Sequence, residues 1–156
     1  MAVAKIISGG QTGVDRAALD AGMESGLVVG GWCPKGRKAE DGIIDKKYPL
    51  VETEEEDYSV RTEKNVLDSD GTLILNWGEL CGGTKYTAQC AARHKKPLLI
   101  VDMDCAFNPL KVVEWIHLHR VAIVNVAGPR ESKKPEAYDR TLEFLQSLFS
   151  RMSSVS

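Results

Sequence analysis

The sequence predicts an α/β fold, a doubly wound, mostly parallel sheet in a Rossmann-like three-layer sandwich, and two observations carry this prediction. Short apolar runs at 3–8, 27–32, 72–77, 97–103 and 121–128 are continuous rather than alternating in polarity, as expected for strands buried on both faces. Segments with helical periodicity lie between these runs, and strands that alternate with helices form parallel sheets through right-handed crossovers. We therefore expect one domain over residues 1–150.

The helical segments have their own sequence signals. Helices are expected over 15–25, 57–69 and 86–94, from Asn108 onward and from Pro135 onward. Asn followed by Pro is typical of an N-cap and first helical turn, which is the basis for the fourth helix. The small polar residues of the C-terminal tail, 151–156, are expected to fray.

The charge and the cysteines restrict the class of protein. A formal net charge of -2 argues against a protein that coats nucleic acid, because such proteins carry an excess of basic residues. No apolar stretch approaches the roughly 20 residues that span a bilayer, and no signal peptide is evident. The cysteines are irregularly spaced and form no C-x-x-C pair, so we expect reduced thiols in a soluble, cytoplasmic protein with neither a membrane nor a nucleic-acid partner.

A glycine-rich loop follows the first predicted strand and leads into the first helix. Backbone N–H groups and the helix dipole favour an anionic group at such a turn, so the loop is a candidate phosphate site. The candidate residues are Gly9, Gly10, Gln11, Thr12, Gly13, Asp15 and Arg16. Glycines at a strand-to-helix turn can also be purely steric, and the spacing matches neither G-x-G-x-x-G nor a Walker loop. Both interpretations stay open at this level.

A second glycine turn, "NWGELCGGTKYTAQC" at 76–90, also joins a strand to a helix. If the strands at 3–8 and 72–77 are neighbours, Gly82, Gly83 and Thr84 face the first loop across the crevice at the carboxyl edge of the sheet. Two facing amide-rich turns predict an anion site more strongly than either turn alone. A strand order that separates them would leave two unrelated turns.

Basic and polar side chains outside the glycine turns could complete such a site. Arg61 and Asn65 are one helical turn apart and can point to the same side, where they would bind a phosphate or only hold a carboxylate. Lys35 lies in the irregular segment 33–57, for which we expect one short edge strand around Leu50 and Val51.

Six stretches in order, "GGQTGVDRAALD", "GGWCPKGRKAEDG", "YPLVE", "RTEKNVLDSDGTLIL", "GGTKYT" and "NVAGPRES", closely resemble the molybdenum cofactor carrier family. That family belongs to a wider Rossmann-like group with the DNA-processing protein A and the lysine decarboxylase-like phosphoribohydrolases. The resemblance covers about residues 3–150. It implies a homo-oligomer and a pocket for a small phosphorylated ligand, which for the characterised carrier is molybdenum cofactor. The metal would arrive with that cofactor, and we expect no metal site of the protein's own.

The resemblance also implies site residues. It supports Gly9 to Gly13, Asp15 and Arg16 on one wall, Gly82 to Thr84 with Thr87 on the other, and Lys35, Arg61 and Asn65 beside them. One departure matters: the phosphoribohydrolases follow a P-G-G-x-G-T motif with a catalytic glutamate, whereas this chain has "CGGTKYTAQC". Losing that carboxylate removes the general acid/base for an N-glycosidic bond, unless Asp15 replaces it.

These observations favour a binding or carrier protein for a phosphate-bearing pterin or nucleotide-like ligand, with molybdenum cofactor as the leading candidate. The alternatives are a nucleotide-processing N-glycosidase with Asp15 as its catalytic residue, and a nucleotide sensor.

Overall fold

The computed structural model describes residues 3–155, with side chains described through residue 152. Its centre is a five-stranded sheet in the order β2-β1-β9-β7-β8, and every strand pair in it is parallel. The strands are β1 (Lys5–Ile7), β2 (Val28–Gly30), β7 (Gly71–Asn76), β8 (Leu98–Asp102) and β9 (Ile123–Ala127). The predicted doubly wound α/β fold is confirmed.

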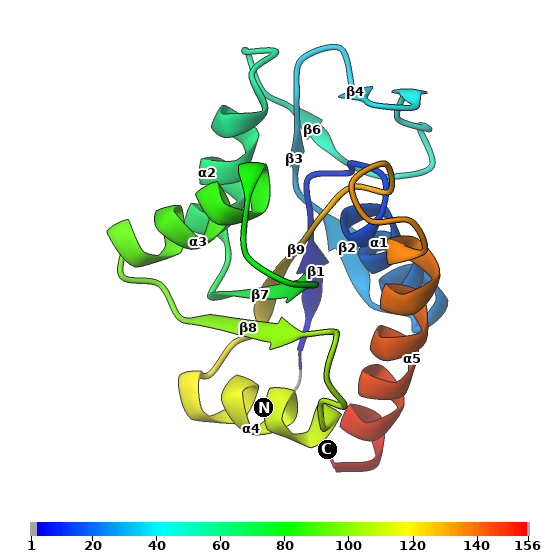
Figure 1. Ribbon diagram of the computed structural model, residues 1–156, viewed down its shortest axis with the longest axis vertical. Helices are drawn as coiled ribbons and strands as arrows, with labels where there is room; N and C mark the ends of the chain where they lie inside the picture. Colours follow the sequence, from blue (N-terminus) through cyan, green and yellow to red (C-terminus); the bar gives the residue numbers. More distant parts are fainter. Residues whose placement is uncertain (1–2, 156) are drawn as a thin grey trace.

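Helices cover both faces of this sheet, which makes three layers (Figure 1). The helices are α1 (Val14–Glu24), α2 (Tyr58–Asp68), α3 (Gly82–Arg93), α4 (Pro109–His119) and α5 (Ala137–Val155). On one face α5 packs against α1 and α4, and on the other α2 packs against α3. Every residue of β7 is buried, which explains its uninterrupted apolar sequence.

The strand order differs from one condition considered above. β9 lies between β1 and β7 and pairs with both, so β1 and β7 are not neighbours. The chain enters the sheet at β1 and β2, passes to β7 and β8, and returns to fill the centre with its last strand. This insertion depends on long-range pairing that local apolar patterns do not encode. The winding still reverses at this centre, so the crevice lies at the ends of β1, β9 and β7.

The segment between β2 and α2 contains more regular structure than the single edge strand that we predicted. The apolar run at 27–32 divides at Gly31, which has φ of +124°, and a Cβ there would lie 2.4 Å from the Ser8 carbonyl oxygen. Beyond it, β3 (Trp32–Cys33) pairs in parallel with β6 (Val51–Glu52), the strand expected near Leu50 and Val51. A small hairpin joins β4 (Lys38–Ala39) to β5 (Gly42–Ile43).

Two helix boundaries also differ from the predicted ones. α3 begins at Gly82, so the second glycine turn is itself the first helical turn. α5 begins at Ala137 and continues through Val155, into the segment expected to fray, and residue 156 lies outside the described residues. Over residues 3–155, no helix is both long enough and apolar enough to cross a membrane.

Candidate functional site

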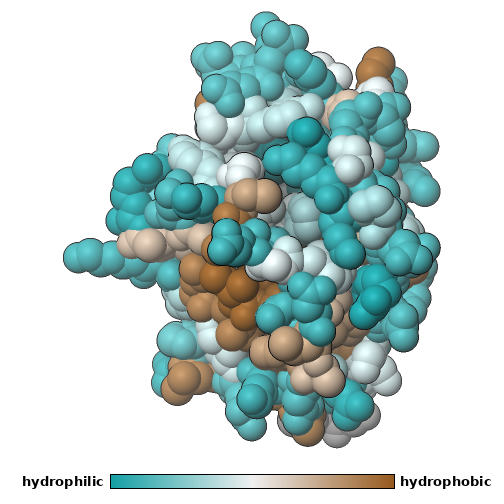
Figure 2. All heavy atoms as spheres, in the orientation of Figure 1, coloured by the Kyte–Doolittle hydropathy of each residue, from teal (hydrophilic) through white to brown (hydrophobic). Residues whose placement is uncertain are grey.

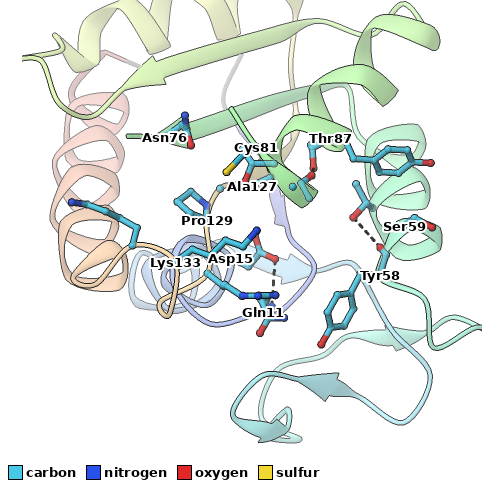
Figure 3. A pocket seen from close by; sticks show the side chains of 18 of the residues that line it. Gln11, Asp15, Tyr58, Ser59, Asn76, Cys81, Thr87, Ala127, Pro129 and Lys133 are labelled. Atoms are coloured by element: carbon cyan, nitrogen blue, oxygen red, sulfur yellow. Dashed lines mark hydrogen bonds between the residues drawn. The ribbon is translucent and has the colours of Figure 1, made fainter. Parts of the chain in front are cut away.

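A cavity of about 310 Å³ opens at the carboxyl ends of β1, β9 and β7. Its lining combines residues of the loop after β1, the first turns of α2 and α3, and the loop between β9 and α5. Figure 3 shows Gln11 and Asp15 on one side, Cys81 and Thr87 on the opposite side, and Ala127 and Pro129 between them. This volume lies at the lower end of the range for small-molecule pockets, roughly 300–1,000 Å³.

The start of α3 presents unused backbone donors to the cavity. The N-cap is Cys81, and the Lys85 amide is the first to bond inside the helix, to the Cys81 carbonyl at 3.2 Å. The amides of Gly82, Gly83 and Thr84 precede it and have no intrahelical acceptor, and within the described residues no other acceptor is assigned to them. All three residues line the cavity, so the positive end of the helix dipole faces it.

The loop between β9 and α5 adds three cations. Arg130, Lys133 and Lys134 line the cavity, and the Lys133 ammonium lies so close to Gly82 that a Cβ there would be 2.6 Å from it. Arg130 pairs with Glu40 at 3.2 Å, whereas the Lys134 ammonium lies 5.8 Å from the centre of the Trp77 ring. Together with Arg61 these groups outnumber the carboxylates of the lining, Asp15 and Glu79, and the cavity favours an anion.

Asp15 and Arg61 form a buried pair at one wall of the cavity. Their side chains are 6% and 13% exposed, and Arg61 Nη1 lies 3.6 Å from Asp15 Oδ2. Burial raises the pKa of Asp15 to about 6, although the Arg61 guanidinium and the Gln11 amide oppose this shift. Arg61 Nε is buried without a hydrogen-bond partner in the described structure. A loose ion pair with an unused donor can rearrange when a ligand enters.

The amides of the first glycine loop are used by the protein itself. Gly10 N–H donates to Ser8 Oγ, Gln11 N–H to Asp15 Oδ2 and Thr12 N–H to Gln11 Oε1. At the start of α1, the Val14 amide donates to the Pro129 carbonyl and the Arg16 amide to that of Gln11.

The loop's glycines are tightly packed. A Cβ on Gly9 would lie 2.2 Å from the Arg61 guanidinium, one on Gly10 2.6 Å from Leu50, and one on Gly13 2.5 Å from the Pro129 carbonyl oxygen. Of the residues that we predicted in this loop, Gln11 and Asp15 line the cavity.

The other predicted residues divide in the same way. Arg61, Gly82, Gly83, Thr84 and Thr87 line the cavity, while Lys35 and Asn65 do not. Asn65 is buried and bonds both the N–H and the C=O of Trp32, so it attaches α2 to β3.

The β4–β5 hairpin closes the rim of the first loop. Arg16 pairs with Asp41 at 3.0 Å and donates to the Gly10 carbonyl, which occupies its charge. Glu40 accepts hydrogen bonds from Thr12 Oγ1 and from Ser132 N–H. Thr12 Oγ1 in turn accepts from the Glu131 amide. Thr12 and Arg16 therefore hold the hairpin and the β9–α5 loop in place beside the cavity.

Sequence reasoning missed several lining residues. Tyr58, Trp77 and Tyr86 supply aromatic walls, and Lys133 and Lys134 supply charge. The available signal was position, since each of these residues lies in or next to a segment that follows a strand or opens a helix at the carboxyl edge of the sheet. Among residues 3–155, no group of His, Cys, Asp and Glu side chains could hold a metal ion, and the cysteines described there are free.

A family model described as the circularly permutated YpsA SLOG family matches residues 6–149. The chain belongs to this family. This SLOG-family chain is also similar to a crystal structure from Syntrophus aciditrophicus SB described as "Putative molybdenum carrier protein". The two are 48% identical, superpose with a TM-score of 0.90, and match over 95% of each chain. No curated protein matches the chain. The family resemblance that we predicted from the motifs is confirmed.

Proposed function

We propose that the protein is a binding protein for a small anionic ligand with a phosphate group and a planar ring. The observation that carries this proposal is the set of unused amides of Gly82, Gly83 and Thr84, which face a cavity together with the ammonium group of Lys133. Backbone amides at a helix start and nearby cations are the groups that hold phosphate in proteins.

The aromatic walls support the second half of the proposal. Tyr58, Trp77 and Tyr86 line the same cavity, and a heteroaromatic ring can stack on such side chains while its phosphate lies at the start of α3. Purine nucleotides and phosphorylated pterins both have this combination. The carrier name of the related crystal structure and the SLOG family model make molybdenum cofactor the leading candidate, with its metal as cargo.

Native mass spectrometry of gently purified protein tests this proposal. We expect a bound species whose mass corresponds to a phosphorylated pterin or a nucleotide, and saturable binding when the emptied protein is titrated with molybdenum cofactor or with AMP. Gly83→Asp should abolish binding without unfolding the chain, because no atom lies within 4 Å of a Cβ at this position.

The matched control is Gln89→Asp, which adds the same charge to an exposed position of α3 outside the cavity. The control should bind like the wild type. Binding that is equal in Gly83→Asp and wild type would contradict the placement of the phosphate, and absence of binding for both probes would contradict the ligand class.

A second candidate function rests on Asp15. A buried carboxyl group with a pKa of about 6 can exchange a proton near neutral pH, which is what a general acid needs. Its position in the lining supports an N-glycosidase that cleaves nucleoside monophosphates, with Asp15 in the place of the absent glutamate. Release of free base by the wild type but not by Asp15→Asn would support this activity, and no release from a panel of purine and pyrimidine monophosphates would count against it.

A further inference from the structure

We propose that the open edge of β8 is the surface through which two copies of the chain associate, as antiparallel neighbours in one continuous sheet. This proposal is independent of the ligand. It rests on the backbone of β8, on the side chains that the strand exposes, and on the charges at its two ends.

The hydrogen-bond pattern of β8 shows which residues face outward. The Thr72 amide donates to the Pro97 carbonyl, and the Met103 amide donates to the Asn76 carbonyl. Residues 97 and 103 therefore point toward β7, and so do the odd-numbered residues between them, because successive backbone groups alternate in direction along a strand. The N–H and C=O groups of Leu98, Ile100 and Asp102 point away from β7, and β8 pairs with no other strand in the described chain.

The strand lacks the features that usually protect an edge. Proteins blunt edge strands with charges, prolines, bulges or a very short length, yet Leu98 to Val101 is an uninterrupted apolar run. Ile100, at the middle of the strand, is 41% exposed. Figure 2 shows hydrophobic surface over β7 and β8, surrounded by hydrophilic surface. Exposed apolar surface of this kind marks an association site.

The opposite edge of the sheet is different. β2 has three residues, and the chain leaves it through Gly30 and Gly31 to form β3. Val28 is 63% exposed there, but the strand is too short to present a row of backbone groups. The two edges therefore provide a test site and a matched control.

The charges at the ends of β8 select a second copy as the occupant and fix its direction. Lys95 and Lys96 precede the strand, and Asp102 and Asp104 end and follow it. In an antiparallel pair with its twofold axis at Ile100, Lys96 of each copy lies opposite Asp104 of the other, whereas a parallel pair would bring like charges together. Ile100 then meets its own equivalent, and the outward groups of Leu98 meet those of Asp102.

Sedimentation equilibrium tests the surface. We expect the wild type to dimerise, Ile100→Lys to weaken the association at least tenfold, and Val28→Lys to leave it unchanged, with equal thermal stability in all three proteins. If the wild type is a tetramer, Ile100→Lys should reduce it to dimers. A monomeric wild type, or an Ile100→Lys protein that associates like the wild type, would overturn the proposal.

Disulfide trapping tests the register. In a background with Cys81→Ser and Cys105→Ser, Ile100→Cys should form a covalent dimer under mild oxidation, because paired residues on a twofold axis have Cα atoms about 5.5 Å apart and disulfides span about 4.4–6.8 Å. Leu98→Cys should remain uncrosslinked, since its equivalent lies too far along the partner strand. The reverse result would exclude this register.

Discussion

The two glycine turns of this protein look alike in the sequence and differ in space. Gly9, Gly10 and Gly13 are buried, and each occupies a position where a side chain would collide with the protein. Gly82 and Gly83 are exposed, and a Cβ on Gly83 would meet nothing within 4 Å. The first turn therefore uses glycine to pack protein against protein. The second uses it to leave room in a cavity.

The amides follow the same division. In the first turn the donors of Gly10, Gln11 and Thr12 bond to side chains of that loop or of its flanking residues, whereas the first amides of α3 have no such partners in the described structure. A glycine-rich strand-to-helix turn is thus a binding site only where its donors stay unused. What the first turn contributes to the cavity is Asp15 and Gln11.

The largest expected effect breaks the comparison at Gly13. Gly13→Ala must adopt φ near +78° and place its Cβ 2.5 Å from the Pro129 carbonyl oxygen, so we expect the free energy of unfolding to fall by about 3 kcal/mol or more. Gly83→Ala should change it by no more than about 0.5 kcal/mol. Urea denaturation of both variants measures the contrast. Equal losses would mean that the two turns are equally packed.

The next effect concerns the protonation of Asp15. Its pKa is raised from 3.8 to about 6, so the folded protein holds this proton at pH values where the unfolded chain has released it. Stability from this group is therefore present below pH 4 and is lost as the pH rises to 6, by about 3 kcal/mol in total.

The measurement is the free energy of unfolding of wild type and Asp15→Asn at pH 4 and pH 7. We expect the wild type to lose stability relative to the variant as the pH rises, since the amide does not titrate. The difference between the two proteins isolates Asp15 from carboxylates elsewhere, such as Asp41, whose pKa its bond to Arg16 lowers. A pH-independent difference would contradict the raised pKa.

A smaller effect separates the neighbours Arg61 and Asn65. Asn65→Ala leaves the buried N–H and C=O of Trp32 without their side-chain partner, which should lower the free energy of unfolding by about 2 kcal/mol. Ligand affinity at low temperature should not change, because Asn65 does not line the cavity. Calorimetric titration with AMP checks this, and a loss of affinity in folded protein would return Asn65 to the site.

The smallest effect sharpens the comparison at the open turn. Lys133→Gln removes one exposed cation beside Gly82, and we expect AMP or molybdenum cofactor to bind about tenfold more weakly, a loss of about 1.4 kcal/mol. Lys35→Gln, which removes an exposed lysine outside the cavity, is the matched control. Equal affinities in the two variants would exclude a phosphate contact by Lys133.

The fold class could be predicted because five buried parallel strands leave continuous apolar runs in the sequence. The strand order could not, because nothing local in β9 indicates that it pairs with both β1 and β7. The turn at Gly82 and Gly83 was found from its glycines. Lys133 and Lys134 were missed because surface lysines are common, and their position depends on how the β9–α5 loop folds back over α3.

The central position of β9 also determines when the cavity can exist during synthesis. Before residue 123 leaves the ribosome, β2 with β1 and β7 with β8 are separate half-sheets with no strand to join them. The cavity lies at that seam, and part of its lining comes from residues 127–134. A nascent chain therefore exposes the facing edges of β1 and β7 until its last fifth has been made, and the candidate site forms only once that part is available.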